Sequence, residues 1–321
     1  MADELYDIRN SFLVGNFHQV IAEGQSVRSV KKKAEEVRAF NADRDSLVAR
    51  AQIALGQYDV VIEDLKTSGH PVLKAVGKLA EVAKEMATMP DSGMSSKVGG
   101  LVELLGATEP SKADVSEVDV ALIVCTGIAM SRNFAEAVTT AAKWVGGIGA
   151  SPDLQRRKLE LIGIIADGML RMNRPDLAEK EVEKMKQVDD ESTLAILLGG
   201  MAALRLGSVK PERYDDAVSS FQEVNARCGQ SVSVLNLIAL ANLGRGRAAE
   251  AERNLLDALA KKSGDPDTVS NLAVVCAHLG KPQEASMRYI LQARSAVPLS
   301  PFVRQYAAVE ERFAAAVDKM E

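Results

Sequence analysis

The fold is decided by two stretches in the last third of the chain, residues 232–256 (VSVLNLIALANLGRGRAAEAERNLL) and residues 266–290 (PDTVSNLAVVCAHLGKPQEASMRYI). The second stretch follows the first at an interval of 34 residues, and a small residue with a large apolar one four positions later recurs at that interval. The residues concerned are Ala217, Ala251 and Ala285, with Phe221, Leu255 and Tyr289. This period and pairing are typical of tetratricopeptide repeats, which consist of two antiparallel helices each. The small residue lets the two helices approach closely, and the large one fills the gap against the next pair.

The same register extends toward the N-terminus with looser spacing. A glycine or another turn-forming residue is expected between the two helices of each pair, and five extra residues around Pro211 lengthen one of these connections. The predicted turn positions are Gly280, Gly246, Gly207, Asn173, Arg132, Gly56 and Gly15. Between residues 70 and 110 the pattern weakens into a helical segment, a turn-rich segment at 89–100 and a short apolar segment, which we interpret as a degenerate repeat.

The C-terminus predicts one further helix over about 301–319. Ser300 and Pro301 are typical of a helix start, and an apolar stripe follows with a spacing of three to four residues. The stripe consists of Phe302, Tyr306, Val309, Phe313 and Val317. A terminal repeat must close the stack, so this helix is expected to cap it. The sequence therefore predicts an all-α, tetratricopeptide-like α-solenoid of about eight helix pairs, forming a single domain over residues 1–321 with a C-terminal capping helix.

Composition excludes several classes of protein. Lys and Arg total 39 against 44 Asp and Glu, and the resulting net charge of −5 gives no electrostatic basis for nucleic-acid binding. Aromatic residues make up only 4%, which argues against β-sandwiches and barrels. The longest uncharged stretches, residues 120–131 and 192–204, are shorter than the roughly 20 residues of a membrane-spanning helix. With an N-terminus unlike a signal peptide and three scattered cysteines, we expect a cytoplasmic protein without direct membrane insertion.

The residue types that carry catalysis or bind metals are not grouped. His18, His70 and His278 fall in different predicted repeats. Cys276 and His278 are two residues apart, a spacing that turns them to different faces of a helix. Cys125 occupies a small-residue position of a repeat, where a buried thiol is expected. We therefore predict no catalytic residues, no cofactor and no metal.

The repeat register identifies candidate groove positions on the first helices of the last repeats. Most of them are apolar, and one lone arginine cannot hold a charged peptide terminus. The candidates for a partner-binding groove are Leu194, Leu197, Met201, Leu204, Arg205, Asn236, Leu240, Leu243, Val274 and His278. Two interpretations stay open: these residues cover an apolar surface of a partner, or a tightly wound superhelix buries them against its own helices.

Four segments resemble the coatomer epsilon subunit family. They are residues 4–25 (ELYDIRNSFLVGNFHQVIAEGQ), 173–195 (NRPDLAEKEVEKMKQVDDESTLA), 271–289 (NLAVVCAHLGKPQEASMRY) and 300–306 (SPFVRQY). The resemblance covers essentially the whole chain and is weakest at residues 86–112. It implies a non-enzymatic subunit of the COPI vesicle coat whose repeats wrap around the C-terminal domain of alpha-COP and stabilise it. It further implies peripheral location on Golgi and COPI vesicle membranes, in Golgi-to-ER and intra-Golgi transport.

Two other functions are considered. A tetratricopeptide adaptor or co-chaperone that binds transient peptides should have basic, Asn-rich groove positions, which the last repeats lack. An all-helical enzyme should bring perturbed ionisable groups together in one site.

Overall fold

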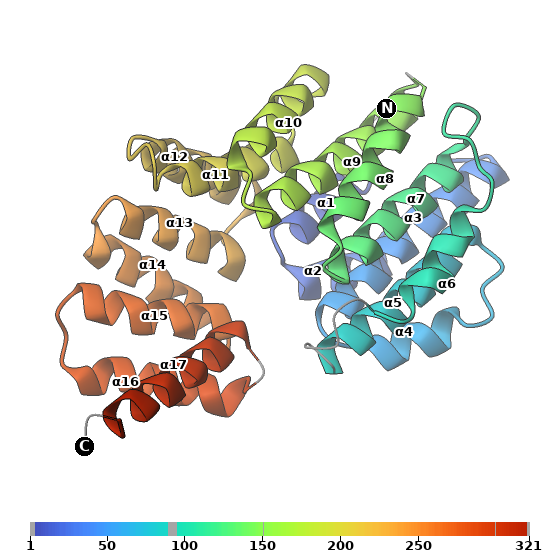
Figure 1. The fold of residues 1–321 in the computed structure, drawn as a ribbon. Helices are drawn as coiled ribbons and strands as arrows, with labels where there is room; N and C mark the ends of the chain where they lie inside the picture. The colour runs from blue at the N-terminus through green and yellow to red at the C-terminus, as the bar shows by residue number, and fades with distance from the viewer. Residues whose placement is uncertain (1–3, 89–94, 150, 299, 320–321) are drawn as a thin grey trace. The chain divides into compact units, whose positions relative to one another are not determined.

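The computed structural model describes residues 4–88, 95–149, 151–298 and 300–319, and within these ranges the chain is helical without a β-strand. The chain divides into two compact units, Met1–Leu206 and Gly207–Glu321, which are considered separately (Figure 1). The all-α prediction is confirmed. In the order of elements along the chain, helix pairs follow one another and a final helix ends the series, as the repeat pattern predicts.

The first unit mixes long helices, such as α3 with 21 residues, with short ones, such as α6 with five. Its elements are α1 (Tyr6–Leu13), α2 (Phe17–Ser26), α3 (Ala34–Ala54), α4 (Tyr58–Leu65), α5 (Pro71–Thr88), α6 (Val98–Val102), the 3-10 turn η1 (Glu103–Leu105), α7 (Val115–Met130), α8 (Phe134–Gly147), α9 (Pro152–Arg171), α10 (Pro175–Val188) and α11 (Thr193–Leu206).

The second unit contains the most regular repeats. Its elements are α12 (Arg213–Cys228), α13 (Val232–Gly244), α14 (Ala248–Lys261), α15 (Pro266–His278), α16 (Gln283–Ala296) and α17 (Pro301–Val317). Side-chain caps fix where the first helix of each pair begins: the Ser231 hydroxyl accepts from the Val234 backbone N–H, and the Asp265 carboxylate accepts from that of Thr268.

The turns inside the helix pairs fall where the sequence predicts them. Six of the seven predicted turn residues adopt the left-handed backbone conformation that reverses the chain after a helix. They are Gly15, Gly56, Arg132, Asn173, Gly246 and Gly280. The exception is Gly207, where the longer connection around Pro211 makes the turn differently. The repeat register is therefore correct at these positions.

Five of the six residues expected at the helix crossings are buried, and Ala285 is half-buried. Ala217, Phe221, Ala251 and Leu255 have no exposed surface, and Tyr289 is 7% exposed. Burying a large apolar side chain contributes about 1.5–3 kcal/mol, so Phe221, Leu255 and Tyr289 each stabilise the contact between successive helix pairs.

The weak segment between residues 70 and 110 contains one full helix, α5, followed by the short α6 and η1. Leu101 of α6 is completely buried and packs in the same cluster as Val76 and Leu79 of α5. Part of the predicted turn-rich segment, residues 89–94, lies outside the described residues. The second helix of this pair is thus reduced to little more than one turn that still carries a core side chain.

The apolar stripe of α17 closes the repeat stack only over its first half. Val303 is buried, and Phe302 and Tyr306 pack against the core of α15 and α16. In contrast, Val309 and Phe313 are 62% and 72% exposed. The expectation that the whole stripe caps the stack is wrong for this second half, where α17 contacts α16 through the ion pair of Glu310 with Arg294 and leaves these apolar side chains in solvent.

Candidate functional site

The exposed groove candidates of the second unit lie on α13 and α15. Leu240 of α13 is 36% exposed and Val274 of α15 is 38% exposed, and the two occupy equivalent repeat positions. His278, the last residue of α15, is also exposed. Leu243 is half-buried against the cluster formed by α13 to α16. The first helices of these repeats therefore present apolar side chains to solvent.

Asn236 has a different role, because it is 6% exposed and fully engaged within the unit. Its side-chain amide donates to the Val232 carbonyl at 2.9 Å and to the Thr268 hydroxyl at 2.8 Å, and its oxygen accepts from the Asn271 amide at 2.9 Å. The Thr268 hydroxyl in turn donates to Asp265 at 2.9 Å. This ladder links α13 to α15, so we leave Asn236 out of the partner surface.

The remaining candidates belong to α11 in the first unit. Arg205 is exposed, and the apolar ones are half-buried, namely Leu194, Leu197, Met201 and Leu204. Met201 packs against two clusters of α9 to α11, and Leu194 lies against Gly163 of α9. On this helix the structure thus favours the second interpretation, in which groove positions partly pack against the chain's own helices.

The first unit has an apolar recess of about 750 Å³ whose walls come from α1, α3, α7, α9 and α11 and from the start of α8. Apolar side chains that include Leu122, Ile164 and Leu194 line it. Three arginines contribute to the lining as well, namely Arg50, Arg132 and Arg171. We call this the arginine-rimmed recess. Of the sequence-predicted groove residues, only Leu194 belongs to it.

A second, polar recess of about 740 Å³ in the same unit adjoins a buried ion cluster. Arg157 of α9 pairs with Asp119 of α7 and with Asp43 of α3, and Arg156 also pairs with Asp43. Burial raises the pKa of Asp119 to about 6, and Arg157 offsets only part of this effect. Each arginine of this cluster is paired with a carboxylate of another helix, so the cluster holds helices together rather than presenting a reactive group.

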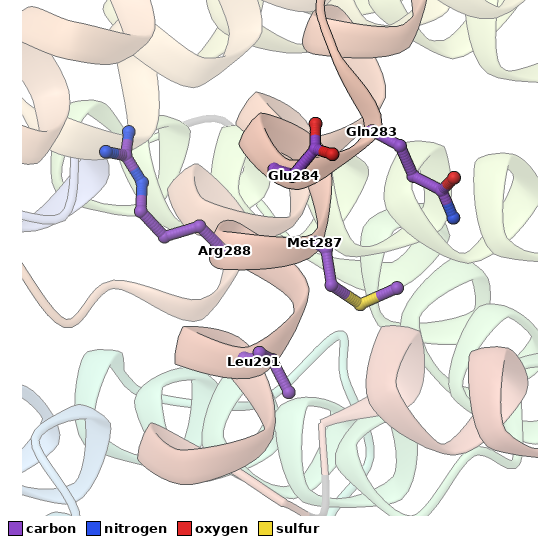
Figure 2. Close-up of a pocket in the computed structure, with 5 residues that line it drawn as sticks. All are labelled: Gln283, Glu284, Met287, Arg288 and Leu291. Atoms are coloured by element: carbon purple, nitrogen blue, oxygen red, sulfur yellow. The ribbon is translucent and has the colours of Figure 1, made fainter.

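In the second unit, a shallow surface of about 470 Å³ lies along α16. Figure 2 shows its five lining side chains, all from this helix, with Met287 and Arg288 projecting to different sides. A single helix cannot make polar groups converge on a ligand, so this surface is not a candidate for catalysis or small-molecule binding.

The described residues do not assemble a metal or catalytic centre. No group of three or more His, Cys, Asp or Glu side chains among them could hold a metal ion. Burial raises the pKa of the Cys125 thiol to about 12, which keeps it protonated and unreactive. None of the helices in the described ranges combines the length and the apolar character needed to cross a membrane.

Comparison with known proteins decides the family. The family model described as coatomer epsilon subunit matches residues 1–321. This chain belongs to the coatomer epsilon subunit family. It is 28% identical to coatomer subunit epsilon-1 of Arabidopsis thaliana over 97% of the chain and 95% of that protein. It is 26% identical to coatomer subunit epsilon of Dictyostelium discoideum over 92% of the chain and 91% of that protein.

Solved structures support the fold. The chain matches one in the crystal structure of the APC/C hetero-tetramer Cut9-Hcn1 with a TM-score of 0.56 and 14% identity, over 92% of this chain and 52% of that one. It matches a tetratricopeptide repeat protein from Parabacteroides merdae with a TM-score of 0.53 and 10% identity, over 90% of this chain and 96% of that one. The tetratricopeptide-like prediction is thereby confirmed.

Membership of the coatomer epsilon family makes this chain a structural component of the COPI coat and not an enzyme. It implies membership in the coatomer complex and association with a cytosolic coat. The sequence-based assignment to this family is confirmed over the full length.

Sequence reasoning missed Arg50, Arg132 and Arg171. The groove register covers only the first helices of the last repeats, whereas these arginines lie on α3, in the turn before α8 and at the end of α9. One signal was present in the sequence, because Arg132 stands at a turn position that glycine fills in several other pairs.

Proposed function

We propose that this coatomer epsilon subunit binds the C-terminal domain of alpha-COP through the inner faces of its repeats and stabilises that domain within the coat. In this role it acts in Golgi-to-ER and intra-Golgi transport, and it reaches Golgi and COPI vesicle membranes peripherally through the coat.

The observation that carries the proposal is the exposure of Leu240 and Val274 at equivalent positions of successive first helices. Apolar side chains that recur on the same face of adjacent repeats form a surface whose burial against a partner removes them from water. A partner of this kind is available within the coatomer complex, since membership of the family makes the chain one of its subunits.

The test is binding of the purified full chain to the alpha-COP C-terminal domain, measured by co-elution and by a rise in melting temperature. The variant Leu240→Asp with Val274→Asp should lose binding while it keeps its fold, because both side chains are solvent-exposed in the free chain and a carboxylate buried at an interface costs several kcal/mol.

The matched control is Leu256→Asp with Leu291→Asp. These leucines are 45% and 55% exposed on the second helices α14 and α16, and the charge change is the same. The control should bind as the unchanged chain does. Failure of the unchanged chain to bind, or equal loss in both variants, would contradict the proposal that the first helices form the interface.

A further inference from the structure

The arginine-rimmed recess of the first unit combines an apolar interior with unpaired positive charge. Its interior side chains come from three different first helices, with Leu122 on α7, Ile164 on α9 and Leu198 on α11. Met130, at the end of α7, is 37% exposed at its edge. An apolar concavity built from several elements is the usual form of a site that receives a side chain of another molecule.

The arginines of this recess are not neutralised to the same extent as its carboxylates. Within the described residues, the Arg132 guanidinium has no carboxylate or hydrogen-bond partner, although the backbone N–H of Arg132 donates to the Ala129 carbonyl at 3.0 Å, and the Arg50 guanidinium stacks over the Phe12 ring at 4.8 Å without an ion pair. The two acidic side chains of the lining are both occupied: Asp167 pairs with Arg171 at 3.3 Å and Glu160 lies 3.9 Å from Arg156.

Positive charge is therefore left over in this recess, although the chain as a whole carries −5. Arg50 is half-buried, so less water screens its attraction for a carboxylate than on an open surface, whereas Arg132 is exposed and adds positive charge at the edge of the recess.

The backbone position of Arg132 adds an independent observation. Its φ is +64°, in the left-handed region, where four of the other predicted turn positions have glycine. A side chain in this conformation carries a cost that glycine avoids, and such residues concentrate at functional sites. Arg132 is one of the residues that line the recess, and it adds a positive charge at this turn that glycine could not supply.

We propose that the arginine-rimmed recess binds a short acidic and apolar segment of the partner protein. An apolar side chain of the segment enters the interior near Leu122, and flanking carboxylates pair with Arg132 and Arg50. This inference rests on the proposed function for the identity of the partner and adds the chemistry of the partner segment and the residues that select it. A basic segment is disfavoured, because its charges would face unpaired arginines.

Two measurements test this inference separately from the proposed function. The first uses the full chain and two fluorescent hexapeptides, in which Leu-Phe is flanked on both sides by pairs of Glu or by pairs of Lys. Fluorescence anisotropy should give at least tenfold tighter binding of the Glu peptide, and Arg132→Glu should abolish this preference. Equal binding of the two peptides, or a preference that Arg132→Glu leaves unchanged, would overturn the inference.

The second measurement uses the alpha-COP C-terminal domain and titration calorimetry at 50 and 300 mM KCl. Arg132→Glu should weaken binding at least tenfold and reduce its salt dependence, because an ionic contact has been lost. Arg38→Glu, an exposed charge reversal on α3 outside the recess, is the matched control and should stay within twofold. Since Arg50 packs on Phe12, the milder Arg50→Gln serves as the second variant and should weaken binding in the same direction.

The outcomes separate the two hypotheses. If the unchanged chain binds the domain and Arg132→Glu binds it equally well, the inference is wrong and the proposed function stands. If the unchanged chain does not bind the domain but prefers the Glu peptide through Arg132, the proposed function is wrong and the recess still binds acidic, apolar segments.

Discussion

Arg157 of α9 and Asp119 of α7 form a bidentate ion pair, with Nε–Oδ1 and Nη2–Oδ2 distances of 2.7 and 2.6 Å. The same guanidinium reaches Asp43 of α3 at 3.2 Å. Arg157 is 5% exposed, and its remaining Nη1 donates to the Asp153 carbonyl at 2.9 Å. One buried side chain thus ties together three helices, and its bond to Asp43 joins residues that are 114 positions apart in sequence.

Arg157→Ala should therefore destabilise the first unit strongly. Removing one partner of a buried ion pair leaves the other charge without compensation, which costs about 3–5 kcal/mol. Urea unfolding followed by circular dichroism gives the loss. Arg171→Ala on the same helix is the matched control, because its pair with Asp167 is 59% exposed on the arginine side and should contribute little. Similar losses in the two variants would show that the buried cluster is not what holds these helices together.

The pKa of Asp119 predicts a pH dependence of stability. Because burial raises this pKa from 3.8 to about 6, the folded protein still holds the proton between these values while the unfolded chain has released it. The contribution of Asp119 is therefore fully present below pH 3.8 and is lost as the pH rises through 6. About two pH units at about 1.4 kcal/mol each give a loss of roughly 3 kcal/mol.

The measurement is the difference in unfolding free energy between the unchanged chain and Asp119→Asn at pH 4, 5, 6 and 7. The unfolding free energy of the unchanged chain should fall relative to that of Asp119→Asn as the pH rises. Asp176→Asn is the comparison and should give a nearly flat difference over this range, because a hydrogen bond from Arg174 lowers the pKa of Asp176 and its contribution is lost only below pH 3.8. A difference for Asp119→Asn that is flat across this range would refute the raised pKa.

The contrast between turns and ion cluster shows what the sequence could predict. Positions such as Gly246 and Asn173 follow from a local rule, because a helix pair needs a left-handed residue where the chain reverses and few residue types suit it. Asp43 and Arg157 follow no local rule. They meet only because the curvature of the first unit brings non-adjacent first helices together, and curvature accumulates from small rotations between repeats that a single sequence does not encode visibly.

The groove candidates fall between these extremes. Leu240 and Val274 are exposed as the repeat register predicts, whereas Asn236, on the same helix as Leu240, is buried. The register gives the face of each helix but not the distance to the next repeat, and α13 and α15 approach closely enough for Asn236 to bond Thr268. A polar residue at such a position is ambiguous in the sequence.

Asn236→Ala should destabilise the second unit by about 1–3 kcal/mol. The substitution removes three hydrogen bonds at once and leaves Thr268 and Asn271 without their shared partner inside the protein. Thermal unfolding of the full chain measures the effect. Asn254→Ala is the comparison, since that exposed amide makes one hydrogen bond to the Glu250 carbonyl within its own helix and should change stability little. Equal effects of the two substitutions would mean that the ladder adds nothing to the contact between α13 and α15.

Tyr214 of α12 sets a limit on the size of Gly244 at the end of α13. A Cβ added to Gly244 would lie 2.4 Å from the Tyr214 ring, and one added to Gly207 would lie 2.5 Å from it. A rigid ring cannot yield at this distance without moving the helix. Gly244→Ala should therefore cost about 1–3 kcal/mol of unfolding free energy.

In a Tyr214→Ala background the ring is absent, and Gly244→Ala should raise the unfolding free energy instead of lowering it. Alanine then stabilises the helix end relative to glycine by up to roughly 1 kcal/mol, because glycine loses more backbone entropy on folding. Gly146→Ala near the end of α8 is the matched control, since a Cβ there meets nothing within 4 Å and the substitution should be neutral or stabilising in either background. Urea unfolding of the four members of the cycle measures the coupling. If Gly244→Ala still lowers the unfolding free energy without the Tyr214 ring, glycine is required at this position for a reason other than contact with that ring.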